Sequence, residues 1–127
     1  RYADVLLLYA EALIESGGSL SEAARYINMV RNRVDMPDID PGLPRYEMRT
    51  ELREERTREL ICEFGHVYFD MRRWDTLADE MLDYWGVKDK HGTSNEPLTS
   101  YSKDYYMWPI PQSEMNTNQK IKQQDPY

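Results

Sequence analysis

One glutamate–histidine pair has the spacing of a metal site. Glu63 and His66 stand three positions apart, which places a carboxylate and an imidazole on the same face of a helix. A bundle metal site needs a second copy of this motif and further carboxylates, whereas the other histidine of the chain, His91, lies in a polar loop segment. The sequence therefore predicts a structural role for the pair, with no metal and no cofactor.

Two carboxylates one helical turn apart, Glu59 and Glu63, could instead be the acid and base of an enzyme. Arg56, Arg72 and Arg73 lie close by in the sequence, and guanidinium groups would hold both carboxylates ionised, which is wrong for a general acid. We favour a partly buried ion network that holds this helix to the next segment. With no phosphate-binding glycine loop and no Ser–His–Asp set, no catalytic residue and no enzyme is predicted.

Aromatic residues towards the end of the chain are candidates for ligand binding. The chain has 10 Tyr and 3 Trp against 2 Phe, and both Tyr and Trp combine an apolar ring with a polar edge. Their rings could stack on the apolar C–H faces of sugars, or they could pin a long polar loop to the body of the protein. The sequence leaves both interpretations open. The predicted ligand-binding residues are Tyr84, Trp85, Tyr101 and Trp108, with Tyr105 and Tyr106 in the same group.

The composition excludes several classes of partner. The net charge of −7 argues against nucleic acid and against electrostatic binding to an anionic membrane. Cys62 is the single cysteine, so no intrachain disulfide can form, and no apolar stretch approaches the ~18 residues of a membrane span. A helical pattern is already under way at Arg1, and we expect the chain to be part of a longer protein.

Helical periodicity dominates the first two thirds of the chain and predicts an all-α fold. Helices over residues 2–16 and 19–36 form a hairpin across Gly17 and Gly18, and Ser19 with Glu22 fits a capping box. Small residues in both helices would permit the close approach seen in a tetratricopeptide unit. The apolar run 5–8 suggests a second buried side of the first helix. The predicted core positions of the hairpin are Ala3, Leu6, Leu7, Ala10, Leu13, Ile14, Leu20, Ala23, Ala24, Ile27, Val30 and Val34.

The remainder is expected to contain a charged helix, a further helical segment and a strap. The charged helix covers about residues 47–64, and another helix or pair of helical turns covers 66–85. Residues 86–105 are polar and irregular, and 106–127 read as an extended strap containing Pro109 and Pro111. The predicted apolar contacts are Leu52, Leu60, Ile61 and Phe64, followed by Val67, Phe69, Met71, Trp74, Leu77, Met81 and Leu82.

Three stretches together resemble the C-terminal part of the SusD/RagB family. Their order and spacing agree with that pattern over nearly the whole chain, although Val67 stands where the family often has Arg and no Gly precedes Tyr127. The stretches are residues 1–12 (RYADVLLLYAEA) with 27–33 (INMVRNR), residues 55–56, 59–60, 63–66 and 69–74 (FDMRRW), and residues 108–118 (WPIPQSEMNTN) with 124–127 (QDPY).

The resemblance implies one C-terminal domain over 1–127, with a tetratricopeptide-like hairpin (1–36), two helical segments (45–85) and a loop and strap (86–127). It implies a non-enzymatic lipoprotein on the outer-membrane surface that binds a nutrient, most often an oligosaccharide and in some branches a peptide, for a TonB-dependent, SusC-like transporter. The lipid anchor would lie outside this chain, and most binding aromatics of the family lie upstream. The alternative is a tetratricopeptide-like scaffold that binds a protein partner.

Overall fold

A computed structural model describes residues 1–79 and 106–123, and these residues contain helices but no strand, which confirms the all-α prediction. The chain divides into two compact units, residues 1–67 and 68–127. Each unit is described by itself below.

The first unit begins with the predicted hairpin. Helix α1 (Tyr2–Glu15) is followed by Ser16 and then Gly17, whose φ of +80° is a conformation that costs glycine little. The amide of Gly18 then donates to the carbonyl of Leu13 at 2.8 Å, closing the turn. Helix α2 (Leu20–Arg31) is capped by Ser19, whose hydroxyl oxygen accepts from the Glu22 amide at 3.2 Å. The turn and the cap are therefore as the sequence predicts.

The end of the second helix differs from the prediction. A 3₁₀ turn, η1 (Asn32–Val34), follows α2, and Asp35 adopts a left-handed conformation with φ of 56°. The helix thus ends at Arg31 and not at the predicted Met36, and the tighter turn rotates Val34 away from the buried stripe. Val34 is 55% exposed, so its predicted place in the core is wrong.

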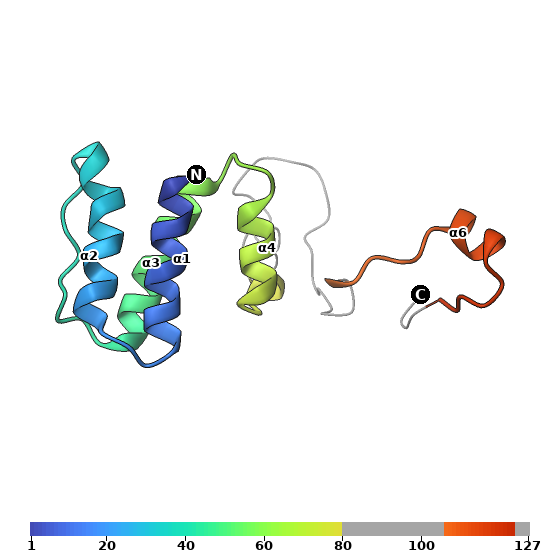
Figure 1. The fold of residues 1–127 in the computed structure, drawn as a ribbon, viewed down its shortest axis with the longest axis horizontal. Helices are drawn as coiled ribbons and strands as arrows, with labels where there is room; N and C mark the ends of the chain where they lie inside the picture. The colour runs from blue at the N-terminus through green and yellow to red at the C-terminus, as the bar shows by residue number, and fades with distance from the viewer. Residues whose placement is uncertain (80–105, 124–127) are drawn as a thin grey trace, which may run out of the picture. The chain divides into compact units, whose positions relative to one another are not determined.

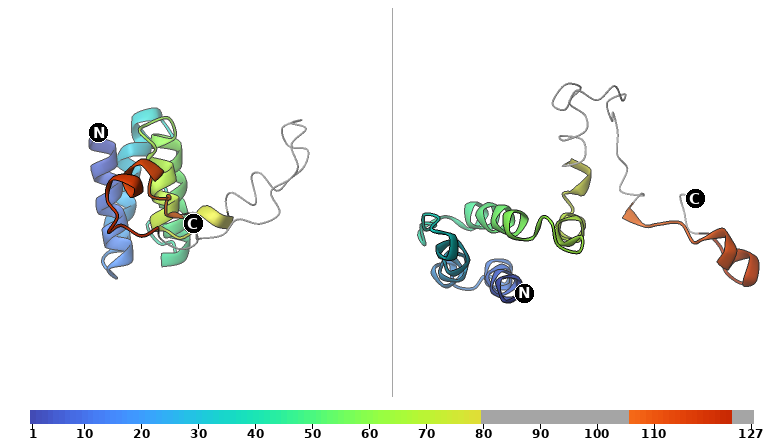
Figure 2. Two further views of the ribbon diagram at one scale, coloured as in Figure 1. Left: turned by 90° about the vertical axis from the view of Figure 1, so that its right-hand side faces the viewer. Right: turned by 90° about the horizontal axis from the view of Figure 1, so that it is seen from above.

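Helix α3 (Arg45–Leu60) packs across one face of the hairpin and contacts both α1 and α2 (Figures 1 and 2). Its apolar side chains are few because most of the helix is charged, but Met48, Leu52 and Leu60 are buried. Together with the inner faces of α1 and α2 they exclude water from the centre of the unit. The core cluster consists of Leu6, Leu7, Ala10, Ile14, Ala23, Ala24, Ile27, Val30, Ile39, Met48 and Leu52.

A side-chain amide fixes the connection between α2 and α3. Asn28 donates to the Ile39 carbonyl at 3.1 Å and accepts from the Ile39 amide at 2.8 Å. Both backbone hydrogen-bonding groups of Ile39 are therefore satisfied, which allows its side chain to enter the core at 5% exposure. The connection contributes to the core although its sequence is rich in proline and aspartate.

Buried ion pairs of α3 join this helix to the hairpin, whereas the sequence predicts a network between this helix and the next segment, and that link stays a prediction. Glu55 of α3, only 3% exposed, pairs with Arg31 of α2 at 2.9 Å. Arg56, 2% exposed, pairs with Asp4 of α1 at 3.0 Å. Two charged side chains of α3 thus reach back to the two preceding helices, because Glu55 and Arg56 are buried on the face that also carries Leu52.

The segment after α3 is more exposed than its apolar sequence predicts. The helix ends at Leu60, and Phe64 and Gly65 adopt positive φ angles of 45° and 75°. Ile61 and Phe64, predicted as core residues, are 66% and 96% exposed, so that prediction is wrong for this chain. The break in helical geometry turns both side chains outward.

Helix α4 (His66–Arg73) opens the second unit and is followed by a break at Asp75, where φ is 59°. Leu77 and Ala78 are buried after this break, in agreement with the core assignment of Leu77. Trp74 is only half-buried and Phe69 is 58% exposed, so the core assignment of Phe69 is wrong. Met81 and Leu82 lie outside the described residues.

The predicted strap contains a short helix. Helix α6 (Gln112–Thr117) begins after Pro111, and Gln112 donates to Asn116 one turn later at 2.9 Å. The Gln123 side chain joins the two ends of this segment. It accepts a hydrogen bond from the Ile110 amide at 3.0 Å and donates one to the Ile110 carbonyl at 3.1 Å. A fully extended strap is therefore wrong for residues 112–117.

Candidate functional site

An aromatic cleft in the second unit is a candidate site among the described residues. Its volume is about 470 Å³, within the range of small-molecule sites. Helix α4 contributes one wall and the segment that starts at Tyr106 contributes the other. We call it the aromatic cleft; it is lined by Tyr68, Phe69, Arg72, Tyr106, Met107 and Trp108.

Helical spacing explains the first wall of the aromatic cleft. Tyr68 and Arg72 are separated by one turn and share a face of α4, and the Arg72 guanidinium lies 5.7 Å from the centre of the Tyr68 ring. Phe69 packs edge-on against Tyr68, with the ring centres 5.5 Å apart and the ring planes at 72°. This contact fixes the rings although Phe69 remains largely exposed.

One hydrogen bond anchors the second wall. The hydroxyl of Tyr106 accepts from the backbone amide of Ala78 at 2.9 Å, and Ala78 is buried. The Tyr106 ring lies 5.9 Å from the Arg72 guanidinium, so this cation contacts rings of both walls. Two segments far apart in the sequence are thereby brought to one site.

The exposed rings of the aromatic cleft have the chemistry of a stacking surface. Trp108 is 75% exposed, Phe69 58% and Met107 51%. The neighbouring Tyr106 is anchored to the Ala78 amide, and Phe69 packs against the Tyr68 ring. Large apolar surfaces kept in water are unusual unless something binds them. Flat rings beside one guanidinium suit a ligand that combines apolar C–H faces with polar groups.

The predicted site residues have different outcomes. Trp108 lines the aromatic cleft, while Tyr84, Trp85 and Tyr101 lie outside the described residues. Tyr68, Arg72 and Met107 were not identified from the sequence. The spacing of Tyr68 and Arg72 on one helix face was the available signal, but nothing in the sequence indicated that this face would meet the segment at Trp108.

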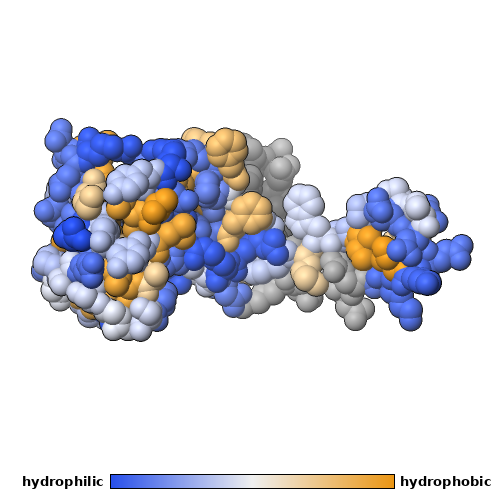
Figure 3. Space-filling model, in the orientation of Figure 1, coloured by the Kyte–Doolittle hydropathy of each residue, from blue (hydrophilic) through white to orange (hydrophobic). Residues whose placement is uncertain are grey.

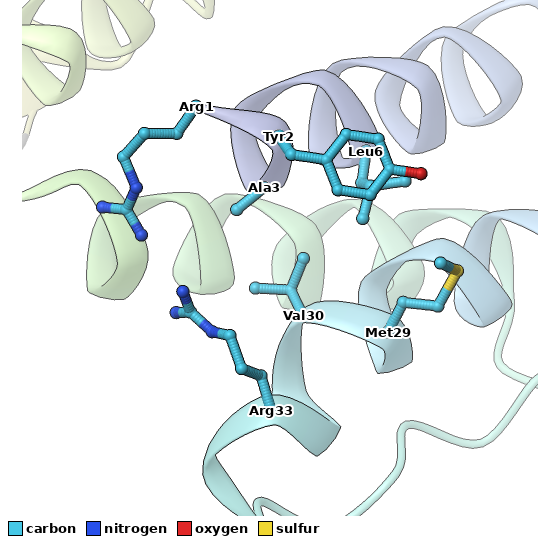
Figure 4. Close-up of a pocket in the computed structure, with 7 residues that line it drawn as sticks. All are labelled: Arg1, Tyr2, Ala3, Leu6, Met29, Val30 and Arg33. Carbon is cyan, nitrogen blue, oxygen red and sulfur yellow. The ribbon is translucent and has the colours of Figure 1, made fainter.

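A second cavity, of about 410 Å³, lies in the first unit between α1 and α2 (Figure 4). We call it the hairpin groove; it is lined by Arg1, Tyr2, Ala3, Leu6, Met29, Val30 and Arg33. Its walls are apolar, and the front of the hairpin also shows an apolar area in Figure 3. Four α1 residues contribute to the exposed apolar surface: Tyr2, Val5, Leu8 and Tyr9.

Carboxylates of the first unit neutralise the two arginines of the hairpin groove. Glu59 accepts hydrogen bonds from Arg33 at 2.8 and 2.6 Å and from Arg1, and Glu63 also pairs with Arg1. The arginines therefore close the rim of the groove and offer little net charge to a ligand. The same pairing occupies Glu59 and Glu63, the two carboxylates with the spacing of an acid–base pair.

The described part of the chain offers no metal site and no membrane span. Residues 1–79 and 106–123 contain no group of three His, Cys, Asp or Glu side chains able to hold a metal ion. Within the same ranges, every helix is too short or too polar to cross a bilayer.

Comparison with known proteins establishes the family. The model of the SusD family matches residues 1–127. The chain belongs to the SusD family. Two curated relatives of this SusD-family chain come from Formosa agariphila. SusD-like protein P2 is 32% identical over 133 residues, which cover 99% of this chain. SusD-like protein P38 is 28% identical over 135 residues, which cover 100% of this chain. The chain spans 25% and 24% of their lengths. No solved structure matches.

Proposed function

We propose that the protein binds an oligosaccharide nutrient without chemical conversion, and that the aromatic cleft contacts the ligand. The exposed indole of Trp108 beside the Phe69 ring is the observation that supports this proposal. A sugar presents an apolar C–H face and a rim of hydroxyl groups, and aromatic rings next to a guanidinium complement both. Membership of the SusD family supports the nutrient-binding role.

We further propose that the protein acts on the outer-membrane surface, held by a lipid anchor outside this chain, and delivers its ligand to a TonB-dependent, SusC-like transporter. Support comes from the family alone. The test is a pull-down of the tagged full-length parent from solubilised outer membranes, followed by mass spectrometry. Co-purification of a large TonB-dependent barrel supports the transporter role, and a soluble parent without a barrel contradicts it.

Glycan binding is tested on the full-length parent with an oligosaccharide panel and titration calorimetry. Removing an exposed ring that stacks on a sugar should weaken binding about tenfold, so Trp108→Ala and Phe69→Ala should each lose affinity. Phe64→Ala is the matched control, because Phe64 is 96% exposed but lies outside the aromatic cleft. Equal affinities in all three variants would exclude the aromatic cleft as the sugar site.

The hairpin groove supports a second candidate function, binding of a protein partner as in a helical scaffold. Its apolar walls and internally neutralised arginines suit an apolar segment of another protein rather than a charged ligand. Met29→Asp in the full-length parent would place a charge in the groove, since Met29 is 43% exposed. Loss of a co-purifying protein with unchanged sugar binding would favour the scaffold.

A further inference from the structure

We propose that the ligand of the aromatic cleft is acidic, and that Arg72 binds its carboxylate or sulfate group. This inference rests on the glycan binding proposed above and names the class of sugar: a uronic acid or a sulfated sugar. The observation behind it is a difference between two neighbouring arginines of α4.

Arg73 has a carboxylate partner within its own helix. Its guanidinium donates to Asp70 at 2.8 Å, and Asp70 is 5% exposed. Arg73 also lies 5.0 Å from the ring of Trp74. Its charge is therefore neutralised by the protein, and it needs no ligand.

Arg72 has no carboxylate partner among the residues that the structure describes. Its described contacts are the rings of Tyr68 and Tyr106, at 5.7 and 5.9 Å from the guanidinium carbon. Contact with the ring face holds a guanidinium in place but leaves its N–H donors unused. Within residues 1–79 and 106–123, Arg72 is therefore a positioned cation whose guanidinium has no carboxylate partner and lines the aromatic cleft.

A positioned guanidinium matches an acidic group better than a hydroxyl. Its planar N–H donors form paired hydrogen bonds to carboxylate or sulfate oxygens, and such charge-assisted bonds are roughly twice as strong as neutral ones. The aromatic walls would then contact the apolar faces of the same sugar. Among the described residues, none of the side chains that line the aromatic cleft is acidic.

The overall charge of the chain does not favour acidic ligands. The net charge of these 127 residues is −7, so the chain does not attract polyanions by its overall charge. A preference for an acidic sugar therefore has to arise at a specific cation, and removal of that cation should abolish it.

The test uses the full-length parent and two pairs of probes: a uronate-containing oligosaccharide with its carboxyl-reduced form, and a sulfated oligosaccharide with its desulfated form. The acidic member of at least one pair should bind on the order of 10- to 100-fold more tightly. Arg72→Gln should remove this difference, whereas Arg72→Lys should keep part of it because the charge remains. Arg25→Gln is the matched control, since Arg25 also lies over a tyrosine ring, at 4.3 Å from Tyr26, but outside the aromatic cleft.

The outcomes separate this inference from the proposed function. If charged and neutral probes bind the parent equally, and Trp108→Ala weakens both, the acidic preference is refuted and glycan binding stands. If Arg72→Gln and Arg25→Gln reduce the preference alike, Arg72 is not its source and the inference fails. If no probe binds, or if Trp108→Ala changes nothing, both proposals fail for this site. A preference lost in Arg72→Gln and retained in Arg25→Gln supports the inference.

Discussion

Two adjacent glutamates of α3 provide a direct test of the buried ion network. Glu55 is 3% exposed and pairs with Arg31 at 2.9 Å and Arg58 at 3.1 Å. Glu54 pairs with the same Arg58, but both side chains of that pair are about half exposed, at 43% and 53%. The two residues thus share a helix, a charge and a partner, and they differ in burial.

Replacing Glu55 by Gln removes a buried charge and leaves Arg31 without its counter-ion. Loss of one member of a buried pair costs about 3–5 kcal/mol. We expect a loss of about 3 kcal/mol in the free energy of unfolding, since Gln can still accept one hydrogen bond. Arg31 also keeps its bond to the Pro37 carbonyl at 2.7 Å. The same change at Glu54 should cost about 0.3 kcal/mol, as for an exposed pair within a helix.

The assay is urea unfolding of the chain followed by far-UV circular dichroism. Glu55→Gln should lower the transition midpoint without changing the slope, which depends on the surface exposed during unfolding. A loss below about 1 kcal/mol at Glu55, or an equal loss at Glu54, would show that burial does not set the strength of these pairs.

Three further substitutions are expected to lower the stability of the protein, because each removes a contact or a backbone conformation described above. The Arg49 side chain donates to Glu15 at 2.5 and 2.8 Å and lowers the pKa of that carboxyl from its usual 4.5. The pair therefore stabilises the protein fully above pH 4.5, and this stabilisation is lost as the pH falls through the lowered pKa. Arg49→Gln should therefore cost a few tenths of a kcal/mol at neutral pH and nothing near about pH 2, as measured by thermal unfolding. Gly17→Ala should cost about 1 kcal/mol because φ is +80°, which the same assay checks. Asn28→Ala should cost about 2 kcal/mol by removing both hydrogen bonds to Ile39, with faster hydrogen exchange at the Ile39 amide; unchanged exchange there would refute the anchoring role.

The sequence predicts the hairpin well because its signals are local. Apolar spacing places Leu7, Ala10 and Ile14 in the core, and all three are fully buried. The stop at Gly17 and the cap at Ser19 depend only on residues within one turn of each helix end. Signals of this kind can be recognised from a short stretch of sequence without knowledge of distant partners.

Features that depend on distant partners are predicted poorly. Ile39 lies two residues after Pro37 in an irregular segment, and its burial is supported by the Asn28 side chain of α2. Phe69 has the spacing of a core residue but faces the aromatic cleft, because a segment beginning at Tyr106 reaches α4. The bond between Ala78 and Tyr106 joins positions 28 residues apart, and no local pattern specifies that pairing. The short helix after Pro111 was missed because its stabilising contact, Gln112 with Asn116, is polar and adds nothing to an apolar period.

The charges of α3 also restrict where this helix can dock. Its buried apolar residues, Met48, Leu52 and Leu60, are spaced by multiples of a turn, and apolar contacts alone would tolerate a shift of one turn, about 5.4 Å. That shift would separate Glu55 from Arg31 and so break a buried ion pair, and it would also separate Arg56 from Asp4. The ion pairs therefore favour one alignment of α3 against the hairpin over alignments shifted by a turn. Substitutions at Arg31 and Glu55 should accordingly be accepted in evolution as pairs, with a change at one position compensated at the other.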